Sequence, residues 1–271
     1  MKLSDALAQA RDARFNRQRA GDVAYSRAQR CVRFLGEKAA SRVTDADLRR
    51  MVAAMLAVGL GPATCNRHLS ALSAVLEQAG VTRAMPWQRE PKGRTRWLTE
   101  AEVTQLAQAC LPRKHGPAVA SLVQFLAETG LRAGEGLALT WADLELEGPR
   151  PHAVVATSKN GDARWVPLTE EAVRVARTRL PQQRGPWCGL SQSTLNHVFR
   201  AARDVVSSTR GDPEVVVHAL RHTAASRLVR AGVSLPVVSA WLGHRDHRST
   251  LRYVHVDQNG LVAAATALMK R

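Results

Sequence analysis

Residues 218–253 read HALRHTAASRLVRAGVSLPVVSAWLGHRDHRSTLRY. The helix predicted from residue 218 places His218, Arg221 and His222 three and four residues apart, so their side chains share or adjoin one helical face. Such a face can bind one phosphate group. Two histidines at this spacing could also hold zinc, but the glutamate of the HExxH motif is missing and Arg221 would repel a divalent cation. Histidines that only cap the helix or pack against it are a further alternative.

The end of this stretch carries a second polar group. Trp241-Leu-Gly-His244 places a histidine after a glycine break, and Tyr253 follows it nine residues later on a new segment. The chain contains only two tyrosines. A lone tyrosine often serves amphipathic packing, but this one follows two clusters of histidine and arginine in a very basic chain.

The net charge indicates the kind of partner. The 271 residues include 39 Lys and Arg against 23 Asp and Glu, which gives a formal charge of +16. Nearly all of the excess is arginine, whose planar group donates paired hydrogen bonds to phosphate. The composition therefore favours a nucleic acid as partner.

Other classes of protein are disfavoured by the composition. With 45% hydrophobic residues the chain can bury one or two substantial cores, so disorder is not expected. No apolar run approaches the roughly 20 residues of a membrane-spanning helix, and the first residues form an amphipathic helix rather than a signal peptide. The cysteines stand singly, which argues against a zinc ribbon or a disulfide framework: Cys31, Cys65, Cys110 and Cys188.

The sequence predicts two domains joined by a linker. Apolar residues recur every three or four positions through residues 1–84, which is typical of a small helical bundle. Residues 85–96, MPWQREPKGRTR, combine two prolines with basic side chains and lack periodicity, so they form a basic linker. Residues 97–271 form the second domain, and the fold class is mainly α with a small β-sheet.

Local signals outline the second domain. Thr99 and Glu102 form a capping box for one helix. The one β-hairpin pairs 152–157 with 163–168 around the turn SKNGD, which puts Lys159 at its tip and leaves Arg164 as a second basic residue nearby. Further helices are predicted over 118–128 (ended by Gly130), from Leu131, and over 170–180, 191–206, 218–231, 234–242 and 257–269.

A third polar motif lies at 129–135, TGLRAGE. Arg132 and Glu135 are three residues apart at a helix start, where a carboxylate can orient a guanidinium group. Taken alone, the pair could equally be a surface salt bridge worth under about 1 kcal/mol.

Taken in their order along the chain, these polar residues resemble the catalytic residues of the tyrosine recombinase, or phage integrase, family. The resemblance covers the whole chain. It implies an N-terminal helical core-binding domain followed by a mixed α/β catalytic domain. Glu135 matches the acidic position that supports the first catalytic arginine. The resemblance assigns catalytic roles to Arg132, Lys159, His218, Arg221, His244 and the nucleophile Tyr253.

The same resemblance implies which residues of the first domain and the linker contact DNA. Residues 63–72, ATCNRHLSAL, are similar to the family's DNA-facing helix, and the basic linker can lie along the backbone. The expected DNA-binding residues are Thr64, Asn66, Arg67, His68, Lys92, Arg94 and Arg96.

The chemistry that follows is strand exchange through a 3′-phosphotyrosyl link. Two arginines would stabilise the charge that develops on the phosphate, and His244 would bind the phosphate. A neutral histidine such as His218 would assist ionisation of the tyrosine, and Lys159 would protonate the leaving 5′ oxygen. Because the link conserves the phosphodiester's energy, no cofactor and no metal are expected. The resemblance implies a homo-tetramer on paired double-stranded DNA sites, with accessory proteins possible, in the cytoplasm and nucleoid of a bacterial or phage-like source.

Two alternatives remain at this point. A DNA-binding protein that never cuts would need only the basic helices, with Tyr253 incidental. A type IB topoisomerase shares the tyrosine chemistry but relaxes supercoils as a monomer. The ordered set of six polar residues argues against the first, and relaxation without recombination would identify the second.

Overall fold

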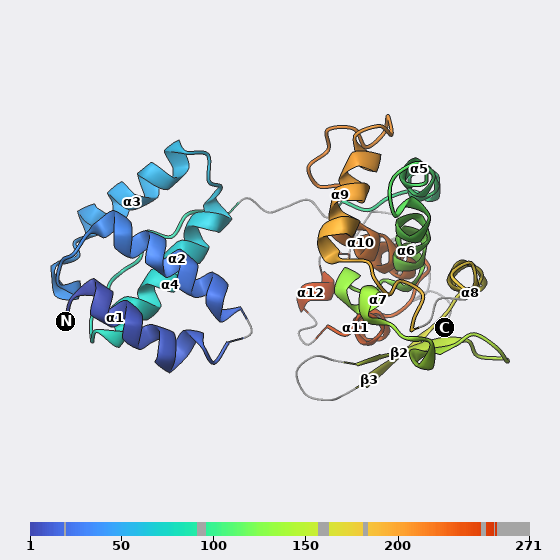
Figure 1. The fold of residues 1–271 in the computed structure, drawn as a ribbon, viewed down its shortest axis with the longest axis horizontal. Helices are drawn as coiled ribbons and strands as arrows, with labels where there is room; N and C mark the ends of the chain where they lie inside the picture. Colours follow the sequence, from blue (N-terminus) through green and yellow to red (C-terminus); the bar gives the residue numbers. More distant parts are fainter. Residues whose placement is uncertain are drawn as a thin grey trace, which may run out of the picture. The chain divides into compact units, whose positions relative to one another are not determined.

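The computed structural model describes residues 1–18, 20–90, 96–156, 163–180, 184–244, 248–251 and 253. The chain divides into two compact units, Met1–Gly93 and Arg94–Arg271, whose helices are labelled in Figure 1. The division falls within the predicted linker. The predicted fold class, mainly α with a small β-sheet, is confirmed.

Unit 1 is a helical bundle. α1 (Leu3–Ala10) runs into a π-helical turn (Arg11–Phe15), and α2 (Gly21–Leu35), a 3-10 turn (Ala40–Arg42), α3 (Asp45–Ala57) and α4 (Pro62–Gln78) follow. α4 packs against both α1 and α2 (Figure 1). The periodic apolar positions form its core, which includes Leu3, Phe15, Leu48, Met51, Leu69 and Leu72.

The helix ends of unit 1 follow their sequence signals. Thr44 caps the start of α3, because its Oγ1 accepts a hydrogen bond from the Asp47 N–H (3.2 Å) and its own N–H donates to Asp47 Oδ2 (3.0 Å). α4 begins at Pro62, since proline is well suited to the first helical position.

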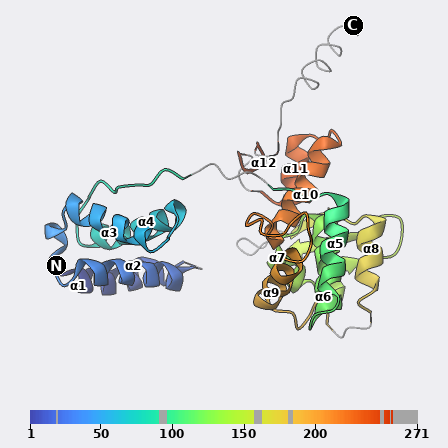
Figure 2. The ribbon, with the colours of Figure 1, turned by 90° about the horizontal axis from the view of Figure 1, so that it is seen from above.

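The centre of unit 2 is α6 (Gly116–Thr129), which is buried on most of its surface. It packs against α5 (Glu100–Cys110), α8 (Glu170–Arg177), α9 (Gln192–Arg203) and α10 (Val217–Arg230) (Figure 2). The Phe125 and Trp187 rings meet at a centroid distance of 4.6 Å in this core, and the Trp187 Nε1–H donates to Ser121 Oγ at 3.0 Å. A helix that is covered on several sides needs apolar residues nearly all round, which explains its composition.

Among the described residues unit 2 contains one antiparallel sheet, in the order β1 (Leu144–Glu145), β2 (His152–Ala156) and β3 (Ala163–Pro167). Residue 155 of β2 pairs with residue 164 of β3. The predicted hairpin strands are therefore confirmed, whereas the two-residue β1 was not predicted. The hairpin turn with Lys159 lies outside the described residues.

The remaining helices of unit 2 are α7 (Ala133–Ala138), α11 (Leu235–Leu242) and α12 (Arg248–Leu251). The predicted helix start at Leu131 was wrong by two residues, because Arg132 is the N-cap of α7. The predicted helix over 257–269 lies outside the described residues. None of the helices in the described part of the chain combines the length and apolar character needed to cross a bilayer.

Candidate active site

Arg221 is a buried cation at the meeting point of two helix ends. α6 and α11 each end in a glycine with positive φ, Gly130 (φ 67°) and Gly243 (φ 65°). Arg221 on α10 is only 2% exposed, and its Nη1 donates to Gly130 O (2.8 Å) while its Nη2 donates to Leu242 O (2.6 Å). Carbonyls at a helix C-terminus lack partners within the helix and carry partial negative charge. The arginine therefore caps both helices and is held rigidly.

Arg221 remains a cation in this position. Burial and, to a smaller extent, the positive charge of the neighbouring Arg132 lower its pKa to about 10. A guanidinium with a pKa of about 10 is protonated at neutral pH. Among the described residues, its hydrogen bonds use two of the five N–H donors that a guanidinium group carries.

Arg132 and Glu135 form the predicted pair at the start of α7. The Glu135 carboxylate accepts from the Arg132 backbone N–H (2.8 Å) and from its Nη1 (2.8 Å). The Arg132 side chain is 47% exposed, and its Nη2 lies 3.5 Å from Gly243 O. Arg132 and Arg221 thus both reach the turn at residues 242–243, one exposed and one buried.

Arg164 is a member of this site to which the sequence analysis gave no role. From β3 its Nη1 and Nη2 donate to the two carboxylate oxygens of Glu135 (3.1 and 2.7 Å), and its Nε donates to Trp241 O (3.2 Å). Its side chain is 10% exposed. The signal was available, because strand alternation places Arg164 opposite the buried Val155, and an arginine on the inner face of a sheet requires a carboxylate partner.

Glu135 is consequently shared by two arginines. Burial by itself would raise its pKa, but the hydrogen bonds from Arg164 and from the Arg132 backbone, together with the charge of Arg164, lower the pKa to about 2. The carboxylate is therefore ionised throughout the physiological range. It positions both guanidinium groups, although only that of Arg132 is exposed toward solvent.

His222 and Tyr253 are joined by a hydrogen bond. His222 Nδ1 lies 2.7 Å from the Tyr253 hydroxyl oxygen, and their ring centroids are 5.6 Å apart. Tyr253 is 4% exposed and packs with Ala225, Val238 and Leu242. His218, one turn earlier on α10, is exposed, and its ring meets the edge of the His222 ring at 4.7 Å.

His244 follows the glycine turn at the end of α11. Its N–H donates to Ser239 O (3.0 Å), and its Nδ1 lies 2.8 Å from the Thr250 hydroxyl. These contacts orient the half-buried ring between α11 and α12.

The structure thus brings together five of the six predicted catalytic side chains, which come from helix ends and turns far apart in the sequence. Helices α6, α7, α10 and α11 supply the framework, as does β3 (Figure 1). The sixth, Lys159, lies outside the described residues. Two cations, imidazoles and a phenol in one place can bind a phosphodiester and attack it.

Residues 96–259, more than half of the chain, match the model of the phage integrase family. The chain belongs to that family. Tyrosine recombinase XerC of Erythrobacter litoralis (strain HTCC2594) is 27% identical over 235 residues, which cover 75% of this chain and 72% of that protein. Tyrosine recombinase XerD of Neisseria meningitidis serogroup B (strain ATCC BAA-335 / MC58) is 28% identical over 232 residues, which cover 78% and 79%.

Solved structures agree on the fold of this integrase. The Tn1549 transposon integrase (residues 82–397), in complex with circular intermediate DNA, has a TM-score of 0.77 at 20% sequence identity, with 100% of both chains covered. As a member of its family the chain is a tyrosine recombinase, an enzyme that cleaves and rejoins DNA strands in site-specific recombination.

In unit 1 of the recombinase, the predicted DNA-facing residues occupy different environments. Arg67 on α4 is exposed. Asn66 is half-buried, and its Nδ2 donates to Gln88 O (2.9 Å) and to Glu90 Oε1 (2.7 Å). Its Oδ1 also accepts from the Gln88 N–H (2.8 Å). Asn66 therefore ties the segment after α4 to the bundle.

The other two residues of that set are less accessible. His68 is 4% exposed, and its Nδ1 lies 2.9 Å from Thr64 O, one turn earlier on α4. The His68 side chain is therefore buried in unit 1, and Thr64 is half-buried. DNA contact by this set stays a prediction, and Arg67 is the member whose exposure fits it best.

Of the three linker residues, only Arg96 lies within the described part, and Lys92 and Arg94 lie outside it. The Arg96 guanidinium pairs with Glu102 (2.5 Å) and with Asp212 (3.2 Å). Burial by itself would raise the pKa of Glu102, but the hydrogen bonds from Arg96 and Thr99 and the charge of Arg96 together lower the pKa below its usual value. The ion pair with Glu102 holds Arg96 against the first turn of α5.

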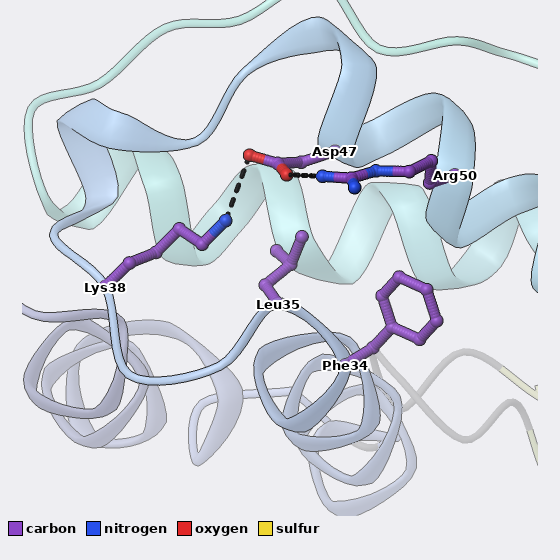
Figure 3. A pocket seen from close by; sticks show the side chains of 5 residues that line it. All are labelled: Phe34, Leu35, Lys38, Asp47 and Arg50. Carbon is purple, nitrogen blue, oxygen red and sulfur yellow. Dashed lines mark hydrogen bonds and ion pairs between the residues drawn. The ribbon is translucent and has the colours of Figure 1, made fainter.

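Unit 1 also contains a cavity of about 260 Å³ between α2 and α3 (Figure 3). Asp47 accepts from Lys38 (3.0 Å) and from Arg50 (2.6 Å) across it, while Phe34 and Leu35 form its apolar wall. The carboxylate is neutralised by its own neighbours and also caps α3. The ion pairs of Asp47 with Lys38 and Arg50 thus have a structural role in unit 1, and we do not treat the cavity as a candidate site.

Proposed function

We propose that this recombinase cleaves DNA with the hydroxyl of Tyr253, forming a 3′-phosphotyrosyl link. The observation that carries the proposal is the position of Tyr253, whose hydroxyl is bonded to His222, the residue next to the buried cation Arg221. A phenol with an ordinary pKa of about 10 needs such neighbours to act as a nucleophile.

The two arginines would supply most of the stabilisation of the transition state. As Oη attacks phosphorus, negative charge grows on the two non-bridging oxygens, and permanently charged bidentate donors hold it best. Arg221 is rigid because it caps two helices, and Arg132 is oriented by Glu135. The proposal assigns one guanidinium group to each non-bridging oxygen.

The remaining groups complete the reaction. His218, exposed at the first turn of α10, and His244, oriented by Thr250, would donate hydrogen bonds to the phosphate. Lys159, from the hairpin turn, would give a proton to the departing 5′ oxygen. A second strand's 5′ hydroxyl then attacks the phosphotyrosine, which restores both the phosphodiester and the tyrosine.

We also propose the substrate, the working oligomer and the cellular location of the enzyme. The substrate is double-stranded DNA, and strand exchange between two duplexes requires several sites at once, so the working form is a homo-tetramer on paired sites. Accessory proteins could set its direction. The similarity to bacterial XerC and XerD supports a protein of the bacterial cytoplasm that acts at the nucleoid.

The first experiment tests the nucleophile. The full chain is incubated with a pool of duplexes that have randomised arms and a nick beside the central region, so that a cleaved fragment diffuses away and traps the covalent intermediate. Adducts are separated on a denaturing gel, and their DNA is sequenced to give the site. Wild type and the control Tyr25→Phe, which changes the other tyrosine, should form adducts, whereas Tyr253→Phe should form none.

Two outcomes would contradict the proposed cleavage by Tyr253, and a third would contradict strand exchange between two sites. Adducts formed by Tyr253→Phe would assign the nucleophile to another residue. Tight binding of the pool by wild type without any adduct would favour a DNA-binding protein that does not cut. Adducts combined with supercoil relaxation but without exchange between two sites would favour the topoisomerase-like alternative.

A further inference from the structure

The hydroxyl of Tyr253 already has a basic partner, and this partner is not the histidine that the sequence analysis selected. A hydrogen bond joins Tyr253 Oη to His222 Nδ1 at 2.7 Å. His218, to which we had assigned the assisting role, is exposed at the start of α10 and touches the His222 ring edge-on at 4.7 Å. The inference that follows rests on the proposed function of Tyr253.

We propose that His222 is the general base of the cleavage step, which accepts the phenolic proton of Tyr253. A general base must lie within hydrogen-bond reach of the proton that it removes, about 2.6–3.2 Å between heavy atoms. His222 meets this condition before any substrate is bound. His218 is thereby left to contact the phosphate.

The surroundings of His222 fit this role. When Nδ1 carries no proton it can only accept, so the Tyr253 hydroxyl donates to it. The phenol ring is nearly fully buried among Ala225, Val238 and Leu242, which restricts where its hydroxyl can point. Arg221 is adjacent in the sequence, so the proposed phosphate site and the proton acceptor belong to one turn of α10.

The step balances in atoms and charge. The Oη–H bond breaks as the Oη–P bond forms, and the proton passes to Nδ1, which makes His222 an imidazolium. The P–O5′ bond breaks, and the leaving oxygen takes a proton from the general acid, which we propose to be Lys159. Rejoining runs the same transfers in reverse, so His222 returns the proton to Tyr253.

The test separates two roles that His222 could have: taking up the proton of Tyr253, and holding the Tyr253 ring in place. In His222→Asn an amide replaces Nδ1 and can still accept a hydrogen bond from the phenol, but it cannot take up a proton. We expect adduct formation on the trapped site to slow by roughly 100-fold or more, the usual contribution of a general base. The matched control is His197→Asn, an exposed histidine on α9, which should keep the wild-type rate.

A second substitution makes the readout specific to proton transfer. Replacing Tyr253 with 3,5-difluorotyrosine gives a more acidic phenol that depends less on a base. If His222 takes the proton, the fluorinated nucleophile should recover most of the activity that His222→Asn loses. Unchanged cleavage by His222→Asn, or a loss that fluorination does not recover, would overturn the proposal.

A third measurement does not depend on any His222 variant folding. In full-length protein labelled with ¹⁵N-histidine, the Nδ1 resonance of His222 should shift when Tyr253 becomes Phe, since the hydroxyl donor is removed. An unchanged resonance would overturn the contact itself. Failure of the proposed function is distinguishable, because it appears as an adduct formed by Tyr253→Phe, independently of residue 222.

Discussion

Glu135 shows how one carboxylate can organise two arginines. It accepts from Arg132 at the surface and from Arg164 beneath it, and its pKa falls to about 2. An isolated exposed pair of this kind would contribute little. The Glu135 side chain is only 17% exposed and the Arg164 side chain 10%, so removing the carboxylate would leave a buried cation unpaired, which is costly.

This pairing predicts a pH-dependent contribution to stability. A carboxylate whose folded-state pKa is about 2 rather than 4.5 stabilises the fold above pH 4.5, and the contribution disappears as the pH falls toward 2. At pH 7 the difference corresponds to about 3 kcal/mol. Urea unfolding should therefore show Glu135→Gln less stable than wild type by about that amount at pH 7, with the gap narrowing steadily below pH 4.5.

The control for this prediction is Glu214→Gln, the same change at an exposed position. It should follow wild type within about 0.5 kcal/mol at each pH. If the gap between Glu135→Gln and wild type were constant from pH 7 to pH 3, the ionised carboxylate would not be its cause.

At the scale of elements, the site depends on how two helices end. Gly130 and Gly243 adopt left-handed backbone angles that turn the last carbonyls of α6 and α11 toward Arg221. Space is also restricted, since a Cβ on Gly130 would lie 2.9 Å from Leu242 Cδ2 and 3.1 Å from Ala224 Cβ. Both the dihedral angle and the packing require glycine at residue 130.

Gly130→Ala should therefore destabilise unit 2 and slow cleavage. The left-handed conformation costs an alanine about 1–2 kcal/mol, and the close contacts add to this, so we expect a loss of roughly 2–4 kcal/mol in thermal or urea unfolding. Gly134→Ala, in open space within α7, is the matched control and should be neutral or slightly stabilising. Equal stability of the two variants would contradict this account of the helix end.

At the scale of the whole molecule, the formal charge of +16 governs encounter with DNA. Several arginines are already committed to partners inside the protein, such as Arg96 to Glu102 and Arg164 to Glu135. Exposed arginines such as Arg67 can contact phosphate, and each contact releases counterions from DNA. Affinity should then depend steeply on salt.

We predict that binding to a non-specific duplex weakens by at least about 1,000-fold between 50 and 200 mM salt, as for proteins with six or more phosphate contacts. Fluorescence anisotropy across the salt series measures the slope. Tyr253→Phe removes no charge and should give the same slope, whereas Arg67→Ala should reduce it by about one contact. A slope near zero would contradict a phosphate-dominated interface.

The sequence by itself determined what depends on near neighbours in the chain. The capping box at Thr99, the hairpin strands and most helices follow from signals within a few residues of one another, and those elements form as predicted. The order of the polar motifs, read with the family resemblance, was enough to place the chain among the tyrosine recombinases. Folding does not change the order of residues along the chain, so these inferences did not depend on the tertiary structure.

Only the tertiary structure decided which partner each polar group has. Arg164 bonds to Glu135 across 29 residues, Arg221 to Gly130 across 91, and His222 to Tyr253 across 31. Several acceptors of the right chemistry were open to each of them from the sequence. Packing of α6, α10, α11 and β3 fixes which acceptors come within hydrogen-bond reach, and a buried polar group must then pair with one of those.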